Sequence, residues 1–459
     1  MTGGRAVDPT PPQTPDGGPA RALPLSFGRF SVLWAGQFVS SVGSGLTAFG
    51  LAAYLFERTG AATSVTLVTL CAFLPPVLLA PVAGMLADRF DRRLLMIAGD
   101  GLSVFGLVFI LAAALAGTAE PWQIYAGVLF SALFASLLDP AYRATITDLV
   151  PEEQYSQASG MVQLAGSAKY LISPFSAGFL YPWCGIEGLL AIDIATFAIT
   201  VATTLVARRP GGARPGGRTG AEDTARAGQT VAFAPGWRAL TAQPGTVALV
   251  AILAVATFCV GFLETLFPPM LLSFSTPQTL GVIETTAATG MLAGSLVLSV
   301  IKITRRHTRA LLIGLGAAGV CVIGVGLTPD TVVIAAFGFC FFAALPFVNT
   351  PAEVLIRSAI PNQAQGRAWG LVSLLTNSGY VIAYAAAGPL ADCLFTPALL
   401  PGGPLAGILG PVFGTGPGRG IGVMIAFVGF FLAVTALALT RSRSLATLAP
   451  PRPDKDDCQ

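Results

Sequence analysis

Gly84-Met85-Leu86-Ala87-Asp88-Arg89-Phe90-Asp91-Arg92-Arg93 is a short charged stretch between two long apolar segments of the chain. Half of its ten residues are aspartate or arginine. A helix inside a lipid bilayer does not tolerate charge at this density, because each charged side chain at the bilayer centre is costly. The stretch therefore predicts a polar turn at a membrane surface, with a membrane-spanning helix on either side.

The composition indicates a membrane protein along the whole chain. Of the 459 residues, 54% are hydrophobic and only 11% are charged, whereas soluble domains carry about 25% charged residues. Apolar runs of about 20 residues recur along the sequence, and each can cross a hydrocarbon core of about 30 Å. Because backbone polar groups in lipid must be satisfied within the protein, we expect an all-α membrane protein.

The apolar runs divide the chain into two sets of six. The expected spans are 30–55, 64–87, 94–117, 122–146, 157–182 and 186–207, then 245–271, 280–303, 310–328, 331–357, 367–390 and 420–440. Residues 1–28 lack the apolar core of a signal peptide, so we expect a disordered cytoplasmic tail. The expected order is that tail, a six-helix bundle over 29–207, a flexible cytoplasmic linker over 208–243, a second six-helix bundle over 244–441 and a cytoplasmic tail over 442–459.

The basic residues predict the orientation of these helices. Of the 26 Lys and Arg residues, all but Arg58, Arg419 and Lys169 fall on the side of the two termini. Because basic residues collect in cytoplasmic loops, we expect a multi-pass protein of the cell inner (plasma) membrane with both termini in the cytoplasm. The net charge of +3 then reflects loops that face anionic membrane lipid and does not indicate nucleic-acid binding.

The two halves of the chain resemble each other. Pro151 and Pro361 are separated by 210 residues, as are Gly160 and Gly370. Two parallel repeats of six helices would place a pore or a substrate cavity between the halves, near the middle of the membrane.

The turn at 84–93 also carries a family resemblance. Its pattern, Gly-x-x-x-Asp-Arg-x-x-Arg-Arg, resembles the loop between helices 2 and 3 of the major facilitator superfamily. The first 200 residues look like the drug:proton antiporter subgroup that includes macrolide and siderophore exporters, and the similarity weakens in the second half. The stretches that carry it include Leu33-Trp34-Ala35-Gly36-Gln37, Leu74-Pro75-Pro76, Asp139-Pro140-Ala141, Val150-Pro151-Glu152 and Ile192-Asp193.

This resemblance implies two pseudo-symmetric six-helix bundles (the major facilitator fold), with the turn acting as a conformational latch. Gly84 would allow close helix packing, and Asp88 would meet the positive N-terminal end of helix 11. Arg92 would pair with Asp148 or Asp139 at the inner end of helix 4. These contacts would hold an outward-open state and break to open inward; the alternative is a solvated turn. The expected latch comprises Gly84, Asp88, Arg89, Arg92, Arg93 and Asp148.

Helix 5 retains part of a second motif of the exporters in this superfamily. Where they carry Gly-x-x-x-Gly-Pro-x-x-Gly-Gly, this chain keeps Pro174 and Gly178 and has the small residue Ser173. Small residues allow close helix contact and proline bends a helix. A kinked, packed helix without a role in export is the alternative reading.

Ionisable residues within the spans are candidates for proton coupling, because charge in the membrane usually faces a cavity or a partner. Glu264 has no basic residue near it in sequence and is the first candidate, with Asp193 second. A Lys169–Asp193 ion pair between neighbouring helices is geometrically possible, and Asp139 lies in the inner half of helix 4. Glu284 is close enough to a span end to be mostly solvated.

Polar and aromatic side chains within the spans are candidates for substrate contacts. A large apolar cavity with a few polar groups suits a bulky amphiphilic molecule. Each of these side chains could equally form a hydrogen bond between helices. The candidates are Gln37, Tyr142, Asn349, Asn377 and Tyr380.

The sequence disfavours ATP hydrolysis, metal binding and redox chemistry. No lysine follows a glycine, so the chain has no Gly-Lys-Ser/Thr phosphate loop for ATP. One histidine and seven cysteines without a Cys-x-x-Cys pair indicate neither a metal site nor a redox site. We expect a monomeric, proton-coupled exporter of a drug-like or natural-product molecule, with no cofactor and no enzyme activity. The alternatives are a lipid or siderophore carrier, an importer, a membrane scaffold, or the permease subunit of an ATP-driven pump.

Overall fold

The computed structural model describes residues 27–207, 237–238, 240–241, 244–301, 307–360 and 365–440. Both expected tails, almost all of the expected linker and residues 302–306 of the loop at 302–309 lie outside this description. Within the described residues all regular secondary structure is helical. The all-α membrane fold is therefore confirmed.

The N-terminal half contains the helices of the first six crossings. The first three crossings are α1 (Phe27–Thr59), α2 (Ala62–Arg89) and α3 (Arg92–Leu115). The fourth is broken into α4 (Pro121–Ala135) and α5 (Leu138–Leu149). After a short 3₁₀ turn at Glu152–Gln154, the remaining helices are α6 (Tyr155–Leu171) and α7 (Ser173–Ala207).

The C-terminal half contains the other six crossings. Its first four are α10 (Pro244–Leu272), α11 (Pro277–Val300), α12 (His307–Leu327) and α13 (Thr331–Ala359). The next is α14 (Gln365–Leu390), which continues through a π-helical turn (Ala391–Phe395) into α15 (Thr396–Leu399). A loop that contains the short α16 (Ala406–Phe413) leads to α17 (Arg419–Thr440).

The described residues form eleven segments that are long and apolar enough to cross a membrane. One of them, Tyr155–Ala207, has 53 residues, and at 1.5 Å per residue a continuous helix of that length would reach about 80 Å. Gly185 divides it with φ 63°, a left-handed conformation that glycine adopts without steric cost. The segment therefore crosses twice, which gives twelve crossings in all.

Local sequence features explain where several helices begin and end. Gly60 has φ 65° between α1 and α2. The Asp91 carboxylate accepts a hydrogen bond from the Arg93 amide (3.0 Å) at the start of α3. The Asp330 carboxylate accepts from the Val332 amide (2.8 Å) at the start of α13. Such caps satisfy backbone N–H groups that have no partner within the helix.

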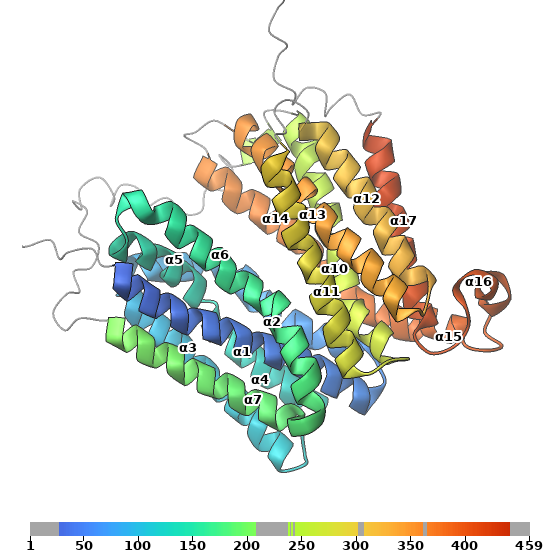
Figure 1. The fold of residues 1–459 in the computed structure, drawn as a ribbon, viewed down its shortest axis with the longest axis horizontal. Helices are drawn as coiled ribbons and strands as arrows, with labels where there is room; N and C mark the ends of the chain where they lie inside the picture. Colours follow the sequence, from blue (N-terminus) through green and yellow to red (C-terminus); the bar gives the residue numbers. More distant parts are fainter. Residues whose placement is uncertain are drawn as a thin grey trace, which may run out of the picture.

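The two halves are splayed and meet at one end (Figure 1). We call this the joined end; it carries the loops after α1, α3, α10, α12 and α15. The opposite, terminal end carries the start of α1, the turn at 89–91 and the end of α17. Contacts between the halves join α2 to α14 and α7 to α11. The other end of each half points away from its partner half in Figure 1.

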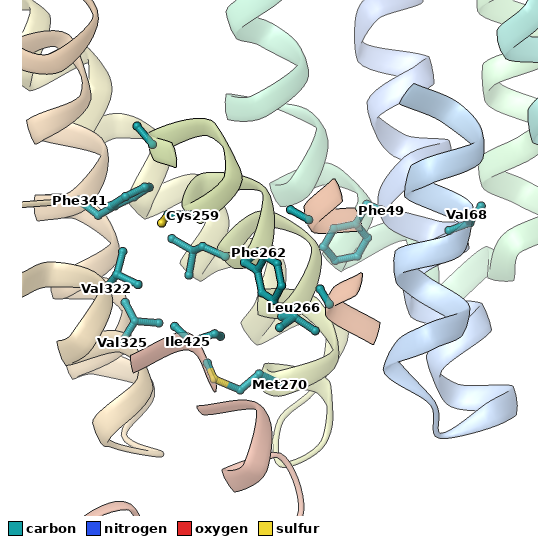
Figure 2. Close-up of a cluster of buried hydrophobic side chains, with 14 of the residues drawn as sticks. Phe49, Val68, Cys259, Phe262, Leu266, Met270, Val322, Val325, Phe341 and Ile425 are labelled. Carbon is teal, nitrogen blue, oxygen red and sulfur yellow. The ribbon is translucent and has the colours of Figure 1, made fainter. Parts of the chain in front are cut away.

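The largest apolar core lies in the C-terminal half and extends across the joined end into the N-terminal half. In Figure 2, Phe262, Leu266 and Met270 of α10 lie among side chains of α12, α13 and α17, while Phe49 of α1 lies on the other side of α10. Leu266 and Met270 are fully buried. The joined end is therefore held by a continuous apolar core as well as by helix contacts.

Glycines bring the backbones of the two halves into contact at the joined end. A Cβ on Gly178 of α7 would lie 2.9 Å from the Pro277 carbonyl oxygen and 3.2 Å from the Gly281 Cα. A Cβ on Gly281 of α11 would lie 3.1 Å from the Pro174 carbonyl carbon. Neither backbone can move aside without a shift of the whole helix, so these positions determine how closely the halves approach.

We predict that Gly281→Ala destabilises this arrangement by about 1–3 kcal/mol, the usual cost of overpacking. The measurement is the thermal unfolding midpoint of the purified protein. Gly101→Ala in α3 is the control, because a Cβ there meets nothing within 4 Å and alanine favours a helix by about 0.5–1 kcal/mol. Equal midpoints for the two variants would contradict close packing of α7 against α11.

Candidate functional site

A cluster of ionisable and aromatic side chains lies on the line where the two halves meet. The C-terminal half contributes Glu264 from α10, Glu284 from α11, and Tyr380 and Tyr384 from α14. The N-terminal half contributes Lys169 and Tyr170 from α6. We call these six residues the Glu264 cluster.

Glu264 is the centre of this cluster. Its Oε2 accepts a hydrogen bond of 2.9 Å from the Tyr384 hydroxyl. The charges of Lys169 and Glu284 also lie within electrostatic range of its carboxyl group. Glu264 is exposed although it lies more than five turns into a spanning helix. Since its neighbours come from both halves, this exposed carboxyl group faces the region between them.

An aromatic group connects the cluster to α2. The Phe73 ring lies 5.5 Å from the Tyr380 ring and 5.4 Å, edge to face, from the Tyr384 ring. The two tyrosine rings are 5.9 Å apart. Aromatic pairs at these separations stabilise one another beyond their apolar burial. Of the predicted cavity residues, Tyr380 is the one that lies in the cluster.

Lys169 and Asp193 do not form the possible ion pair at contact distance. No Lys169 nitrogen lies within 4.0 Å of a described carboxylate, and its Nζ lies 6.0 Å from the centre of the Tyr170 ring. Asp193 is fully buried inside the N-terminal half and accepts hydrogen bonds from Thr47 (2.6 Å) and Thr196 (3.3 Å). The charge of Lys169 still lies within electrostatic range of Asp193, as it does of Glu264.

Two acidic residues lie in surroundings that differ from those expected. Asp139 forms an exposed ion pair of 2.9 Å with Arg143, one turn away on α5. Its carboxylate is therefore occupied within its own helix and is not the partner of Arg92. Glu284, expected to be mostly solvated at a span end, instead lies within electrostatic range of Glu264. Because α11 begins at Pro277, Glu284 lies about two turns inside the helix and not at its end.

The remaining predicted cavity residues are dispersed. Gln37 and Tyr142 are buried within the N-terminal half; the Tyr142 hydroxyl has no hydrogen-bond partner among the described residues, and the Gln37 side chain lies beside the Asp100 carboxyl group. Asn377 donates to Ser373 of its own helix (3.1 Å), and Asn349 is exposed on α13. Sequence reasoning missed Asp100 of α3, which is fully buried beside Gln37. Its place inside an apolar run was the signal that could have identified it.

The turn at 84–93 occupies the terminal end, where the halves are apart. A Cβ on Gly84 would meet nothing within 4 Å, so the close packing expected there is absent in this conformation. Arg92 donates to the Ala144 carbonyl of α5 (2.8 Å), and Arg93 donates to the Ala207 carbonyl at the end of α7 (3.2 Å). Arg89 is exposed in the last turn of α2.

The structure does not describe some of the side chains of the expected latch. The backbone of Asp88 is in the last turn of α2, and that of Asp148 is in the last turn of α5. Nothing further is described for these two side chains or for those of residues 365–369 at the start of α14. The latch contact between Asp88 and helix 11 therefore stays a prediction.

A contact that sequence reasoning missed joins the halves at the joined end. Asp392, just after α14, accepts hydrogen bonds from the Ala62 amide (2.9 Å) and the Thr63 amide (2.7 Å) at the start of α2. A carboxylate at a helix N-terminus satisfies free N–H groups and is favoured by the helix dipole. We call this contact the Asp392 cap.

The predicted helix 5 motif also lies at the joined end. The Ser173 hydroxyl donates to the Val42 carbonyl of α1 (2.9 Å). Pro174 and Gly178 lie against Gly281 of α11. The small residues of this motif are therefore at the contact between the halves, and not merely within one bundle.

Residues 33–384 match the Major Facilitator Superfamily. This chain belongs to that superfamily. Its two groups of six crossings and the site between them are the arrangement that such transporters share. The protein is therefore a multi-pass membrane transporter and not an enzyme.

Two of the following relatives align along most of the chain, and a third aligns along less than half of it. Macrolide efflux protein A of Streptococcus pyogenes is 25% identical over 374 residues, covering 79% of this chain and 89% of that protein. An uncharacterised transporter of the superfamily from Mycobacterium tuberculosis is 28% identical over 396 residues, covering 81% and 86%. The lysophospholipid transporter of Cronobacter sakazakii is 26% identical over 195 residues, covering 42% and 46%.

Solved structures of the superfamily share the fold. The nucleoside transporter NupG superimposes with a TM-score of 0.69 at 13% identity, covering 91% of this chain and all of that one. A bacterial homologue of the human lysosomal transporter Spinster, in an inward-facing and unoccupied conformation, gives a TM-score of 0.68 at 15% identity, covering 94% of this chain and all of that one.

We predict that Asp392→Ala shifts the protein toward states in which the joined end is open. Loss of a helix cap costs about 0.5–2 kcal/mol, which is about a 2- to 30-fold change in population. The measurement is the distance distribution between spin labels at Phe90 and Leu374, introduced in a cysteine-free background; shorter distances report closure of the terminal end.

Asp330→Ala is the matched control, since Asp330 caps α13 at the same end without a contact to the other half. Identical distance distributions for the two variants would show that the Asp392 cap does not contribute to holding the halves together.

Proposed function

We propose that this transporter exports a drug-like or natural-product molecule in exchange for protons, by alternating access between two conformations. The observation that carries this proposal is Glu264: a carboxyl group inside the membrane span that faces the region between the halves and accepts a hydrogen bond from Tyr384. An acid placed there can hold either a proton or a cationic group of a substrate.

The contacts between the halves support an inward-facing state. With both termini in the cytoplasm, as the basic residues predict, the joined end is the outer end. It is closed by the Asp392 cap and by the contact of Gly178 with Gly281. The terminal end is then open to the cytoplasm, which is where an exporter collects its substrate. The Spinster homologue of similar fold is also inward-facing.

The chemistry of the Glu264 cluster suits an amphiphilic substrate. The rings of Phe73, Tyr380 and Tyr384 provide an apolar surface, and aromatic faces attract cations as well. Proton binding at Glu264 would remove the negative charge and so weaken the hold on a cationic substrate. The similarity to macrolide efflux protein A over 89% of that protein supports this class of substrate.

Exchange between the two states would alternate two contacts on one pair of helices. Asp392, at the end of α14, caps the start of α2 in the present state. Asp88, at the end of α2, would cap the start of α14 in the outward-facing state. Because the two contacts lie at opposite ends of the same antiparallel pair, a rocking motion of the halves that closes one end separates the other.

A lipid carrier is the second candidate function, because the lysophospholipid transporter of Cronobacter sakazakii aligns with 42% of this chain. Its substrate would use the same apolar surface but would not require a pH gradient that is acidic on the outer side.

We predict that Glu264→Gln abolishes pH-gradient-driven export, because glutamine keeps the shape of glutamate and cannot release a proton. The measurement is substrate accumulation in everted vesicles with an acidic interior. Glu353→Gln is the control: Glu353 is exposed and pairs with Arg357 at 2.9 Å, and such pairs contribute about 0–1 kcal/mol. Normal export by Glu264→Gln would exclude this residue as the proton carrier.

We also predict that the chain protects an exporter-deficient host against some members of a compound panel that includes macrolides. The measurement is the minimal inhibitory concentration of each compound, with uptake of labelled lysophospholipid assayed in parallel. Asp88→Asn at unchanged surface expression should lose the protection if the latch operates. Lysophospholipid uptake without any protection would favour the lipid carrier.

A further inference from the structure

A pocket lies at the joined end of the C-terminal half, outside the Glu264 cluster. Its volume is about 500 Å³. Its walls come from the loop after α10, from the loop after α12 and from the residues between α16 and α17. The residues that line it include Phe274, Leu327, Val412, Phe413, Thr415 and Arg419.

Arg419 is the charged residue of this pocket. It is the first residue of α17 and is only 4% exposed. Its Nε donates to the Phe413 carbonyl (2.6 Å) and its Nη2 donates to the Gly326 carbonyl at the end of α12 (2.9 Å). Its Nη1 is buried and has no hydrogen-bond partner among the described residues. Backbone carbonyls therefore occupy two of the three guanidinium nitrogens and leave the third without a partner in the part of the chain that the structure describes.

No acidic side chain among the described residues forms an ion pair with Arg419. Asp330 lies next to the pocket wall in sequence, but its carboxylate accepts from the Val332 and Val333 amides (2.8 and 3.3 Å) and does not line the pocket. An arginine stays charged in a protein, and a buried charge without a counter-charge is costly. Arg419 is therefore a buried cation without an acidic partner among the described residues.

Apart from Arg419 and two threonines, the walls of the pocket are apolar, and they reach the surface of the protein. Phe274, Leu327, Val412 and Phe413 supply these walls. Val412 is 62% exposed, and Ile408 on the same short helix, α16, is 73% exposed. Apolar side chains exposed at the end of a membrane bundle lie at the level of lipid headgroups and upper acyl chains.

We propose that this pocket binds a phosphate group through Arg419, with the headgroup of an outer-leaflet phospholipid as one source and free phosphate as the other. Arginine matches phosphate oxygens with its planar set of N–H donors. The start of α17 adds the positive end of a helix dipole at the same place. The apolar walls fit the glycerol and upper acyl carbons of a lipid, whereas free phosphate would use only the guanidinium group.

The test uses the full-length purified protein and two probes. In the first arm, native mass spectrometry measures retention of phosphatidylglycerol against neutral diacylglycerol of the same chain length. In the second arm, the thermal unfolding midpoint is measured with inorganic phosphate against chloride at equal ionic strength. Charge-assisted hydrogen bonds contribute enough that loss of the guanidinium should lower occupancy by about tenfold or more.

Two variants distinguish a loss of ligand binding from a loss of folding. Arg419→Gln removes the charge. Thr415→Asp, at an exposed pocket residue, leaves Arg419 in place and supplies a carboxylate that competes with the ligand. Thr118→Asp is the control, since Thr118 is exposed in the loop between α3 and α4 at the same end of the other half.

If the wild-type protein and Thr118→Asp retain phosphatidylglycerol while Arg419→Gln and Thr415→Asp lose it, that result supports the lipid headgroup as the source of the phosphate group. If no lipid is retained, and inorganic phosphate raises the unfolding midpoint of wild type and Thr118→Asp but not of Arg419→Gln or Thr415→Asp, the ligand is free phosphate. If wild type and Thr415→Asp respond equally to both probes, the proposed site is wrong. None of these outcomes depends on transport, so the proposed export function stands or fails separately.

Discussion

The contact of the two halves at one end only is the constraint on which the rest of the structure depends. Glycine backbones meet where α7 crosses α11, and the Asp392 carboxylate joins the end of α14 to the start of α2. A dense apolar core continues through the same region. Because these contacts lie at the joined end, the halves diverge toward the terminal end (Figure 1), and the Glu264 cluster lies between them.

The placement of charge within the spans follows from this arrangement. Inside one half, Asp193 is surrounded by hydroxyl groups that satisfy its carboxylate. Between the halves, Glu264 has a single tyrosine hydroxyl as hydrogen-bond donor and remains exposed. An acid whose hydrogen bonds are satisfied holds structure together, whereas an accessible acid with few partners can exchange a proton or bind a ligand. This difference separates two residues that look alike in the sequence.

The sequence was sufficient for the fold because apolar run length and charged turns are local properties of the chain. It also predicted Glu264 and Tyr380, which the structure brings into one cluster; their roles stay predictions. It also named Lys169, which lies in the same cluster, but not the hydroxyl groups that surround Asp193, because the direction in which a side chain leaves its helix depends on how the helices are rotated against each other. Asp392 lies 330 residues from its partner amide, so no local pattern could have identified the cap.

The two halves differ in how their last two crossings are connected. In the first half, Gly185 alone makes the turn within a 53-residue segment; in the second, residues 400–418 with α16 separate α15 from α17. A one-residue turn keeps the connected ends of its two helices next to each other, whereas a longer connection sets only a wide upper limit on their separation. The covalent chain therefore restricts the spacing of the last two crossings in the N-terminal half more than in the C-terminal half.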